Sequence, residues 1–175
     1  MKKTCISFLS CIIILLLIIG FFPISAKNNE QYLRIHIRAN SNTEQDQAVK
    51  YSVKKAVVDY LTPYIANCKT KEQAEQIIRE NLKNIESVSN AVLLENGHEY
   101  SSSASVINEE FPERKYLDYT LESGYYDALI INLGSGKGDN WWCVVYPPLC
   151  FTSGETGYVY KSKILEVIKN FYKDK

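Results

Sequence analysis

Side chains that bind metals or act as nucleophiles are scarce in this chain. Its 175 residues include two histidines and five cysteines, and no two histidine, cysteine or acidic residues fall at the spacing of a metal site. Basic and acidic residues number 20 each, so no net charge attracts nucleic acid or anionic lipid. Repeats and low-complexity stretches are also absent. The sequence thus predicts no metal, cofactor, nucleic-acid partner or evident small-molecule substrate.

The first 26 residues have the pattern of a secretory signal peptide. Two lysines precede an uninterrupted apolar run from Cys11 to Phe22, and small residues lead up to Ala26. We therefore predict export across a membrane with cleavage after Ala26. If Ser7 and Ser10 are tolerated, the apolar run lengthens to residues 5–22, and the leader then remains uncleaved as a membrane anchor.

Removal of this leader leaves residues 27–175, which suffice for one hydrophobic core and are too few for two ordinary domains. All 20 acidic residues lie in this part, whereas Lys2 and Lys3 leave with the leader, so 18 basic residues remain and the net charge is −2. Only Cys68, Cys143 and Cys150 remain of the cysteines. We predict a single domain that is not a disulfide-dense scaffold.

The first half of this domain is predicted to be one strand and two helices. Residues 31–38 alternate between apolar and polar side chains, as in a half-buried strand whose polar face carries His36. Capping boxes begin amphipathic helices at Thr43 and Thr70. The first helix extends to about Leu61, before Pro63, and the second to about residue 88.

The second half is predicted to supply most of the sheet. A hairpin turning at Asn96-Gly97 is expected to join residues 91–95 to residues 98–107. Residues 111–121 form an edge or connecting piece. A second hairpin, 125–133 with 140–146, is placed at the sheet centre, and a helix around residues 164–172 closes the domain. The predicted fold class is α+β: a mostly antiparallel sheet of about five strands with three helices on one face, in two layers.

The most informative segment runs from Gly134 to Cys150. Its glycines resemble a phosphate-binding loop, but they lack the required spacing and lead into a strand rather than a helix, so we interpret them as a turn. Trp141 and Trp142 follow. Adjacent strand residues point to opposite faces, so one indole is expected to enter the core and the other to face outward.

Two cysteines bracket the proline pair of this segment. Extended chain would hold Cys143 and Cys150 roughly 23 Å apart, too far for a disulfide. A reversal at Pro147-Pro148 would bring them together and close an eight-residue ring. The sequence leaves a disulfide and two separate buried thiols as open alternatives.

An enzymatic interpretation also starts from the cysteines. A thiol nucleophile needs a histidine base and an orienting polar group, and the residues available for these roles are Cys143, Cys150, His36, His98, Asn40 and Asp139. The pair Glu109-Glu110 suggests paired carboxylates, but adjacent acids diverge on extended chain and are better explained as edge protection. The sequence favours a binding or signalling module, with a cysteine-dependent hydrolase or redox protein as the alternative.

The chain resembles the stage II sporulation protein R family of endospore-forming bacteria over nearly all of the predicted mature domain. Glu122-Ser123 and Tyr146 depart from the family pattern. The residues that carry the resemblance are Arg34-Ile35-His36, Ala39-Asn40-Ser41, Asp46-Gln47, Phe111-Pro112, Arg114, Tyr116, Gly124-Tyr125, Ala128-Leu129, Gly134, Gly136, Gly138, Asn140-Trp141-Trp142-Cys143 and Pro147-Pro148-Leu149-Cys150.

This resemblance implies a secreted signalling protein without catalytic residues. It implies export from the forespore into the septal intermembrane space, where the protein activates a membrane-bound aspartic protease that matures the mother-cell sigma factor precursor. The enzymatic alternative would act in the same space. Because aromatic residues dominate binding energy, we expect the partner-binding residues to include Trp141, Trp142, Tyr146, Pro147 and Pro148, with a second patch at His36 and Asn40.

Overall fold

The computed structural model describes residues 29–116, 119–151 and 158–173, so the predicted leader lies outside the described residues. A four-stranded sheet in the order β2-β5-β1-β6 forms its centre, beside a separate two-stranded sheet. The strands are β1 (Leu33–Arg38), β2 (Ser102–Phe111), β3 (Arg114–Tyr116), β4 (Tyr119–Leu121), β5 (Gly124–Leu133) and β6 (Asn140–Tyr146). The helices are α2 (Glu44–Ile65), α3 (Lys71–Glu80), α4 (Leu82–Glu95), α5 (Tyr158–Lys173) and the 3₁₀ helix η2 (Leu149–Phe151).

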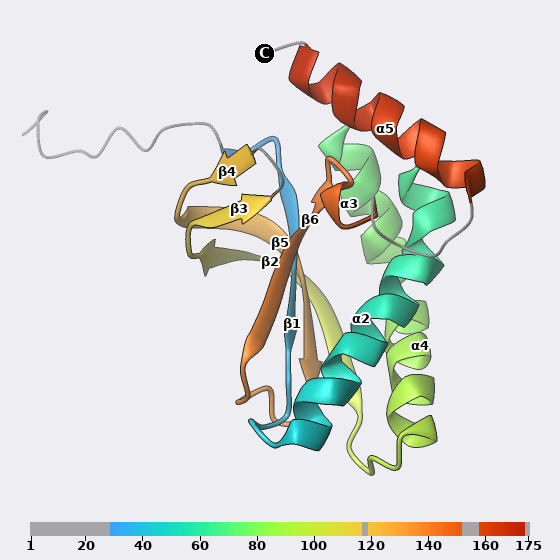
Figure 1. Cartoon of the computed structure of the whole chain (residues 1–175), viewed down its shortest axis with the longest axis vertical. Helices are drawn as coiled ribbons and strands as arrows, with labels where there is room; N and C mark the ends of the chain where they lie inside the picture. The colour runs from blue at the N-terminus through green and yellow to red at the C-terminus, as the bar shows by residue number, and fades with distance from the viewer. Residues whose placement is uncertain (1–28, 117–118, 152–157, 174–175) are drawn as a thin grey trace, which may run out of the picture.

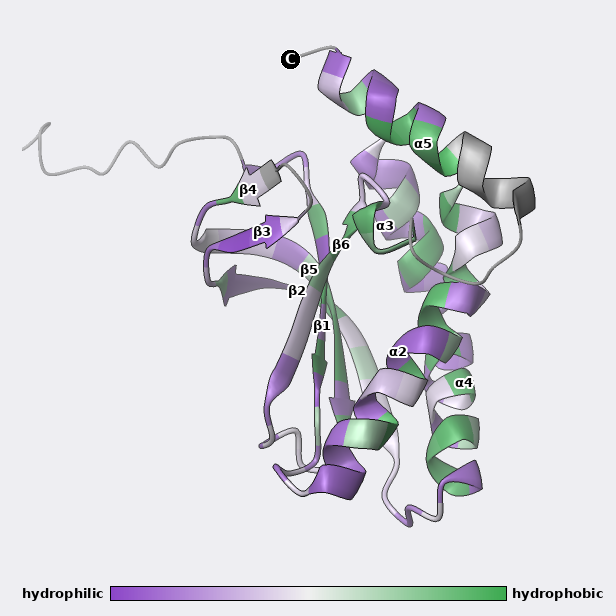
Figure 2. Cartoon of the chain, in the orientation of Figure 1, coloured by the Kyte–Doolittle hydropathy of each residue, from purple (hydrophilic) through white to green (hydrophobic). Residues whose placement is uncertain are grey.

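The helices lie on one side of the four-stranded sheet, and the β3–β4 sheet lies on the other (Figure 1). This arrangement confirms the predicted α+β class, although the strands divide into two sheets and four α-helices are described instead of three. In Figure 2 the strands in the middle of the molecule are largely hydrophobic, whereas β3 on the outside is hydrophilic. No helix in the described part of the chain combines the length and hydropathy that a membrane span requires.

The predicted central hairpin is wrong, because β5 and β6 do not pair. Both strands pair with β1, which runs parallel to β5 and antiparallel to β6. The connection between β5 and β6 crosses the end of β1, where the Gly138 backbone N–H donates to the Ala39 carbonyl oxygen at 2.8 Å. The first strand is therefore central and buried on both faces, instead of half-buried as predicted.

The predicted Asn96-Gly97 hairpin is also wrong. Residues 91–95 belong to α4, Asn96 caps that helix, and Gly97 follows with a positive φ of 78°. Asn-Gly accepts left-handed backbone equally well at a helix end and in a hairpin turn. The buried residues Ile85, Ser89 and Leu93 favour the helix end over the hairpin, because they recur at the four-residue spacing of a helix.

The two capping boxes begin their helices as predicted, but the helix ends differ. Thr43 and Thr70 accept hydrogen bonds from the backbone N–H groups of Asp46 and Gln73. The first helix continues to Ile65 and contains Pro63 in its last turns. The second helix divides into α3 and α4 at Asn81, whose side-chain amide donates to the Ile77 carbonyl oxygen at 2.8 Å and competes with the backbone ladder.

Candidate functional site

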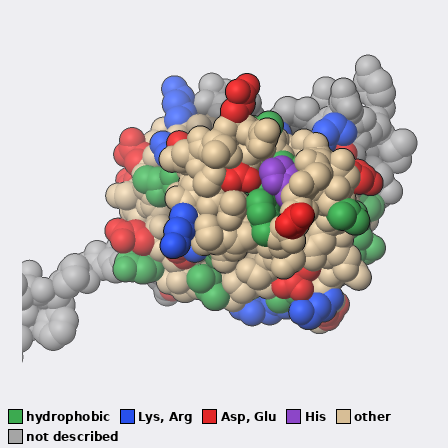
Figure 3. Space-filling model, turned by 90° about the horizontal axis from the view of Figure 1, so that it is seen from below, with side chains coloured by type: hydrophobic (Ala, Val, Ile, Leu, Met, Phe, Trp, Pro, Cys, Tyr) green, Lys and Arg blue, Asp and Glu red, His purple; other side chains and the backbone are tan. Residues whose placement is uncertain are grey.

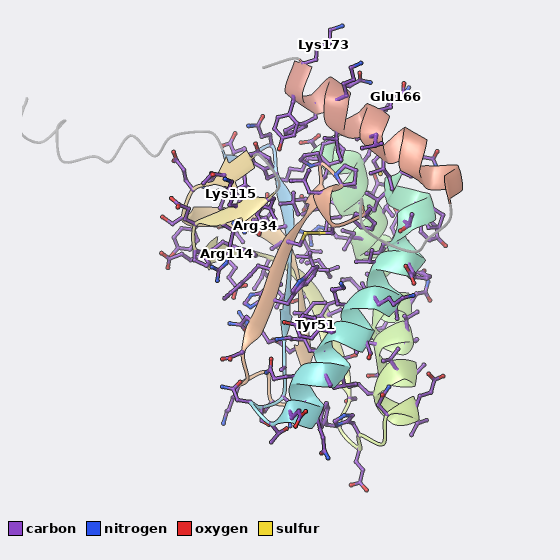
Figure 4. All side chains as sticks on the ribbon, in the orientation of Figure 1. Arg34, Tyr51, Arg114, Lys115, Glu166 and Lys173 are labelled. Atoms are coloured by element: carbon purple, nitrogen blue, oxygen red, sulfur yellow. A yellow bond between two sulfur atoms is a disulfide. The ribbon has the colours of Figure 1, made fainter. Side chains whose placement is uncertain are left out.

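The face of the sheet opposite the helices carries His36 and Glu109, two of the polar residues singled out in the sequence. Along β1, apolar side chains face the helices, and the alternating polar ones face the other way. Figure 4 shows Arg34 between β1 and β3, with Arg114 and Lys115 further out on β3. We call this surface the helix-free face; it comprises Arg34, His36, Arg38, Glu109, Phe111, Arg114, Tyr116, Tyr126 and Trp142.

Arg34 is completely buried in this face. Its Nη2 atom donates to the Tyr116 hydroxyl at 2.7 Å, and its guanidinium lies 4.1 Å from the Phe111 ring centroid and 4.7 Å from that of Tyr126. Burial lowers the pKa of Arg34, but an arginine stays charged in proteins. Within the described chain its Nε and Nη1 atoms have no hydrogen-bond partner, so aromatic faces supply most of its stabilisation.

His36 forms a polar cluster with Glu109 and Arg38. The His36 Nδ1 atom lies 2.8 Å from a Glu109 carboxylate oxygen, and Arg38 forms an ion pair with the same carboxylate. Burial lowers the pKa of His36 to about 4, and Arg38 and Arg34 act in the same direction, while Asn140 raises it. His36 is therefore neutral near pH 7 and donates its Nδ1 proton to Glu109.

The contact with Glu109 orients His36 as a general base is oriented in an enzyme, but no nucleophile accompanies it among the described residues. Its Nε2 atom forms no hydrogen bond of normal geometry among the described residues, so no described hydroxyl or thiol is paired with it. Its ring packs on Trp142, with centroids 5.3 Å apart. The sequence placed His36 on the polar face of a half-buried strand, yet His36 is 4% exposed. The cluster holds Trp142 in place and gives no support to hydrolysis.

The buried imidazole predicts a pH dependence of stability. The pKa of His36 is about 4 in the folded chain against an ordinary 6.5, so between these values the unfolded chain binds the proton more tightly. The contribution of the neutral His36 side chain to the free energy of unfolding is fully present above pH 6.5. About 3 kcal/mol of it is lost as the pH falls toward 4. Urea unfolding at several pH values should show a shallower dependence in His36→Gln than in the unchanged chain. An equal pH dependence of the unfolding free energy in the two proteins would contradict a lowered pKa of His36.

The two tryptophans lie on opposite sides of β6, as predicted, but neither enters the core completely. Trp142 pairs with His36 in the strand register and stacks beneath Arg114, whose Cζ atom is 4.5 Å from the ring centroid. Trp141 faces the helices, where Lys54 Nζ lies 5.6 Å from its ring centroid. Both indoles are half-buried. Each therefore keeps an accessible part beside a cation.

Tyr146, Pro147 and Pro148 are buried. The Tyr146 hydroxyl donates to the Lys69 carbonyl oxygen at 2.5 Å. Tyr146 also lines a cavity of about 600 Å³ between the α2–α3 connection and α5. The chain reverses after β6, and Cys143 and Cys150 form a disulfide with Cα atoms 5.9 Å apart. These residues support the end of β6 and offer little side-chain surface to a partner.

The disulfide removes both candidate thiols from nucleophilic chemistry. The remaining described cysteine, Cys68, is buried, and burial raises its pKa to about 11, so its thiolate is scarce. We expect the double variant Cys143→Ser, Cys150→Ser to lose about 2.5 kcal/mol of unfolding free energy, as loop-closure entropy predicts for an eight-residue ring. Urea unfolding with and without reductant measures this loss. An unchanged midpoint in the double variant would contradict a stabilising bridge.

Asn40 belongs to a structural cluster at the other end of β1. The Asp46 carboxylate, which is 5% exposed, accepts hydrogen bonds from Asn40 Nδ2 at 3.0 Å, from Ser41 Oγ at 2.5 Å and from the Tyr100 hydroxyl at 2.5 Å. His98 Nδ1 lies 3.5 Å from it. We call these five residues the Asp46 cluster. Figure 3 views this end of the molecule, where acidic and basic side chains are interspersed.

The glycine-rich turn after β5 packs against the Asp46 cluster. Asn40 Oδ1 accepts a hydrogen bond from the Ser135 backbone N–H at 2.9 Å. A Cβ atom on Gly134, whose φ is +54°, would lie 2.5 Å from Asn40 Oδ1, and one on Gly138 would collide with the Ser41 backbone. These glycines are thus needed for close packing. They form a turn, as the sequence indicated, but the turn joins two strands that do not pair with each other.

Sequence reasoning missed Glu109 and Tyr100 as members of these clusters. Glu109 was interpreted as edge protection, although the divergence of adjacent acids sends Glu109 to His36 and leaves Glu110 exposed on the other side. No sequence pattern links Tyr100 to Asp46. The described residues include no group of three histidine, cysteine or acidic side chains arranged to hold a metal.

Comparisons with known proteins place the chain in a family. The family model described as stage II sporulation protein R (spore_II_R) matches residues 29–156. The chain is 33% identical over 176 residues to the stage II sporulation protein R of Bacillus subtilis (strain 168), with 93% of this chain and 77% of that protein covered. No solved structure gives a significant match. The resemblance inferred from the sequence is thereby confirmed.

Proposed function

The chain belongs to the stage II sporulation protein R family, and we propose that it is a secreted intercompartmental signal of endospore formation that binds and activates a membrane-bound aspartic protease. In this proposal the forespore exports the chain into the septal intermembrane space. The activated protease then cleaves the precursor of the mother-cell sigma factor. The family match over residues 29–156 is the observation that carries the proposal.

Two further features support export. The leader pattern of residues 1–26 is that of a secretory signal. The Cys143–Cys150 disulfide is of a kind that persists in oxidising compartments and is rare in the cytosol. Both features are expected of a protein that acts outside the membrane of the cell that makes it.

Activation by binding fits the two tryptophans of β6, one on each side of the strand. A near-complete switch requires the signal to bind the active arrangement of the protease about 5.5 kcal/mol more tightly than the inactive one. An interface of about 800 Å² per partner with a few aromatic anchors can supply such energies. The half-buried Trp141 and Trp142, each beside a cation, are the aromatic anchors that this proposal assigns.

The proposal is tested by reconstitution in a bacterial host that does not sporulate. The full chain, the protease and the sigma factor precursor are produced together, and processing of the precursor is followed by immunoblot. We expect processing only when all three are present, in proportion to the amount of the chain. Processing without the protease, or by a few molecules of the chain acting on many precursors, would contradict activation by binding.

A further inference from the structure

The outer side of β6 is an unpaired strand edge. β6 is the last strand of the sheet and pairs only with β1 within the described chain. In Figure 1 it is the strand nearest the viewer, and along its lower half no labelled element is drawn over it. At Asn140–Trp142 no described side chain forms a hydrogen bond with the backbone. We call this stretch the β6 edge.

The opposite edge of the sheet is protected. Along β2, the backbone N–H groups of Ser102 and Ala104 donate to Asn90 and Glu86 of α4 at 2.7 and 2.9 Å. The Val106 carbonyl oxygen accepts from Arg79 of α3 at 3.4 Å. Side chains thus occupy the groups that another strand would use, as is common at sheet edges. The β6 edge lacks this protection among the described residues.

Each side of the β6 edge presents an aromatic ring and a cation. Trp141 and Lys54 lie on the helix side, and Trp142 and Arg114 lie on the helix-free face. Among the described residues, neither cation forms an ion pair. Successive side chains of an added strand would point to alternate sides, so they would meet Trp141 with Lys54 on one side and Trp142 with Arg114 on the other.

We propose that the β6 edge binds an extended acidic segment of the partner as an additional strand of the sheet. The main chain of the segment would pair with the free backbone groups of β6, and its carboxylates would pair with Lys54 and Arg114. Charge complementarity is the reason for choosing an acidic segment. This inference rests on the proposed function, because the segment is assigned to the part of the protease outside the membrane.

The test uses charge reversals with matched neighbours. Lys54→Glu and Arg114→Glu place a negative charge beside each indole. Lys55→Glu and Lys115→Glu are the controls, since these residues are exposed and adjoin the first two in sequence. The full chain, as a bacterial host exports it, is titrated against membranes with and without the protease. Each test variant should bind about tenfold more weakly, and each control within about twofold of the unchanged chain.

Amide hydrogen exchange provides the second measurement, with the unchanged chain. Binding should slow exchange within residues 140–142 by about tenfold or more, and melting curves should show that all four variants are folded. If the chain binds and the charge reversals match their controls, or exchange is unaltered, the β6 edge is not the docking site. If membranes without the protease bind equally, or the chain pairs with itself through this edge, the assigned partner is wrong. If the unchanged chain does not bind the protease, the proposed function itself fails.

Discussion

Replacing Asp46 by alanine should lower the free energy of unfolding by about 4 kcal/mol. The buried carboxylate accepts hydrogen bonds from Asn40, Ser41 and Tyr100, and its removal leaves these donors without a partner. Burial raises the pKa of Asp46, but these hydrogen bonds outweigh it and hold the pKa below the ordinary 3.8. The contribution is therefore complete above about pH 4 and is lost as the pH falls further. Urea unfolding followed by tryptophan fluorescence measures both effects.

Asp59 on the same helix is the matched control. It is partly exposed and forms an ion pair with Lys55 four residues earlier, a type of contact worth about 0.5 kcal/mol or less. Asp59→Ala should therefore be nearly neutral. A loss below about 1 kcal/mol in Asp46→Ala would show that the Asp46 cluster does not fix the start of α2 to the turn after β5.

The sequence predicted the elements well and their pairing poorly. Period-two and helical patterns located β1, β5, β6 and the starts of α2 and α3, because such patterns reflect which side of an element is buried. Pairing depends on long-range contacts that these patterns do not encode. β1 is inserted between β5 and β6, and nothing in its LRIHIR pattern distinguishes a central strand whose polar face is covered by β3 from an edge strand facing water.

The sequence likewise predicted part of the candidate site correctly and part of it wrongly. The alternation along β6 correctly placed Trp141 and Trp142 on opposite sides, and the spacing of Cys143 and Cys150 correctly raised a disulfide as one alternative. The predicted partner-binding set did not separate exposed from supporting residues, however. His36 lies under Trp142 and Asn40 lies in the Asp46 cluster, so specific sequence motifs here mark packing as much as contact.

The helix-free face is built on three polar residues of β1. Residues 34, 36 and 38 of β1 place three basic or titratable side chains in a row, and each is stabilised in a different way. Arg34 is enclosed by aromatic rings, His36 is neutral, and Arg38 pairs with Glu109. The cost of burying the Arg34 charge is offset only while β3 covers it. Rigidity of the helix-free face should therefore depend on that residue.

We expect Arg34→Ala to lose about 4 kcal/mol of unfolding free energy. The substitution removes a completely buried side chain, breaks the hydrogen bond to the Tyr116 hydroxyl and leaves a cavity among Phe111, Tyr116 and Tyr126. Because β3 would lose its anchor, Arg114 should leave Trp142, and the tryptophan fluorescence of the folded state should change. Urea unfolding and emission spectra measure the two effects.

Arg34→Met separates volume from charge. Methionine fills much of the same space with an adaptable apolar side chain, so it restores packing but not the contacts of the charge with aromatic rings or the hydrogen bond to Tyr116. If packing dominates, Arg34→Met should lose only about 1 to 2 kcal/mol, since replacing a buried charge with an apolar group of similar size is often tolerated. A loss equal to that of Arg34→Ala would instead assign the stability of this face to the guanidinium and its aromatic enclosure.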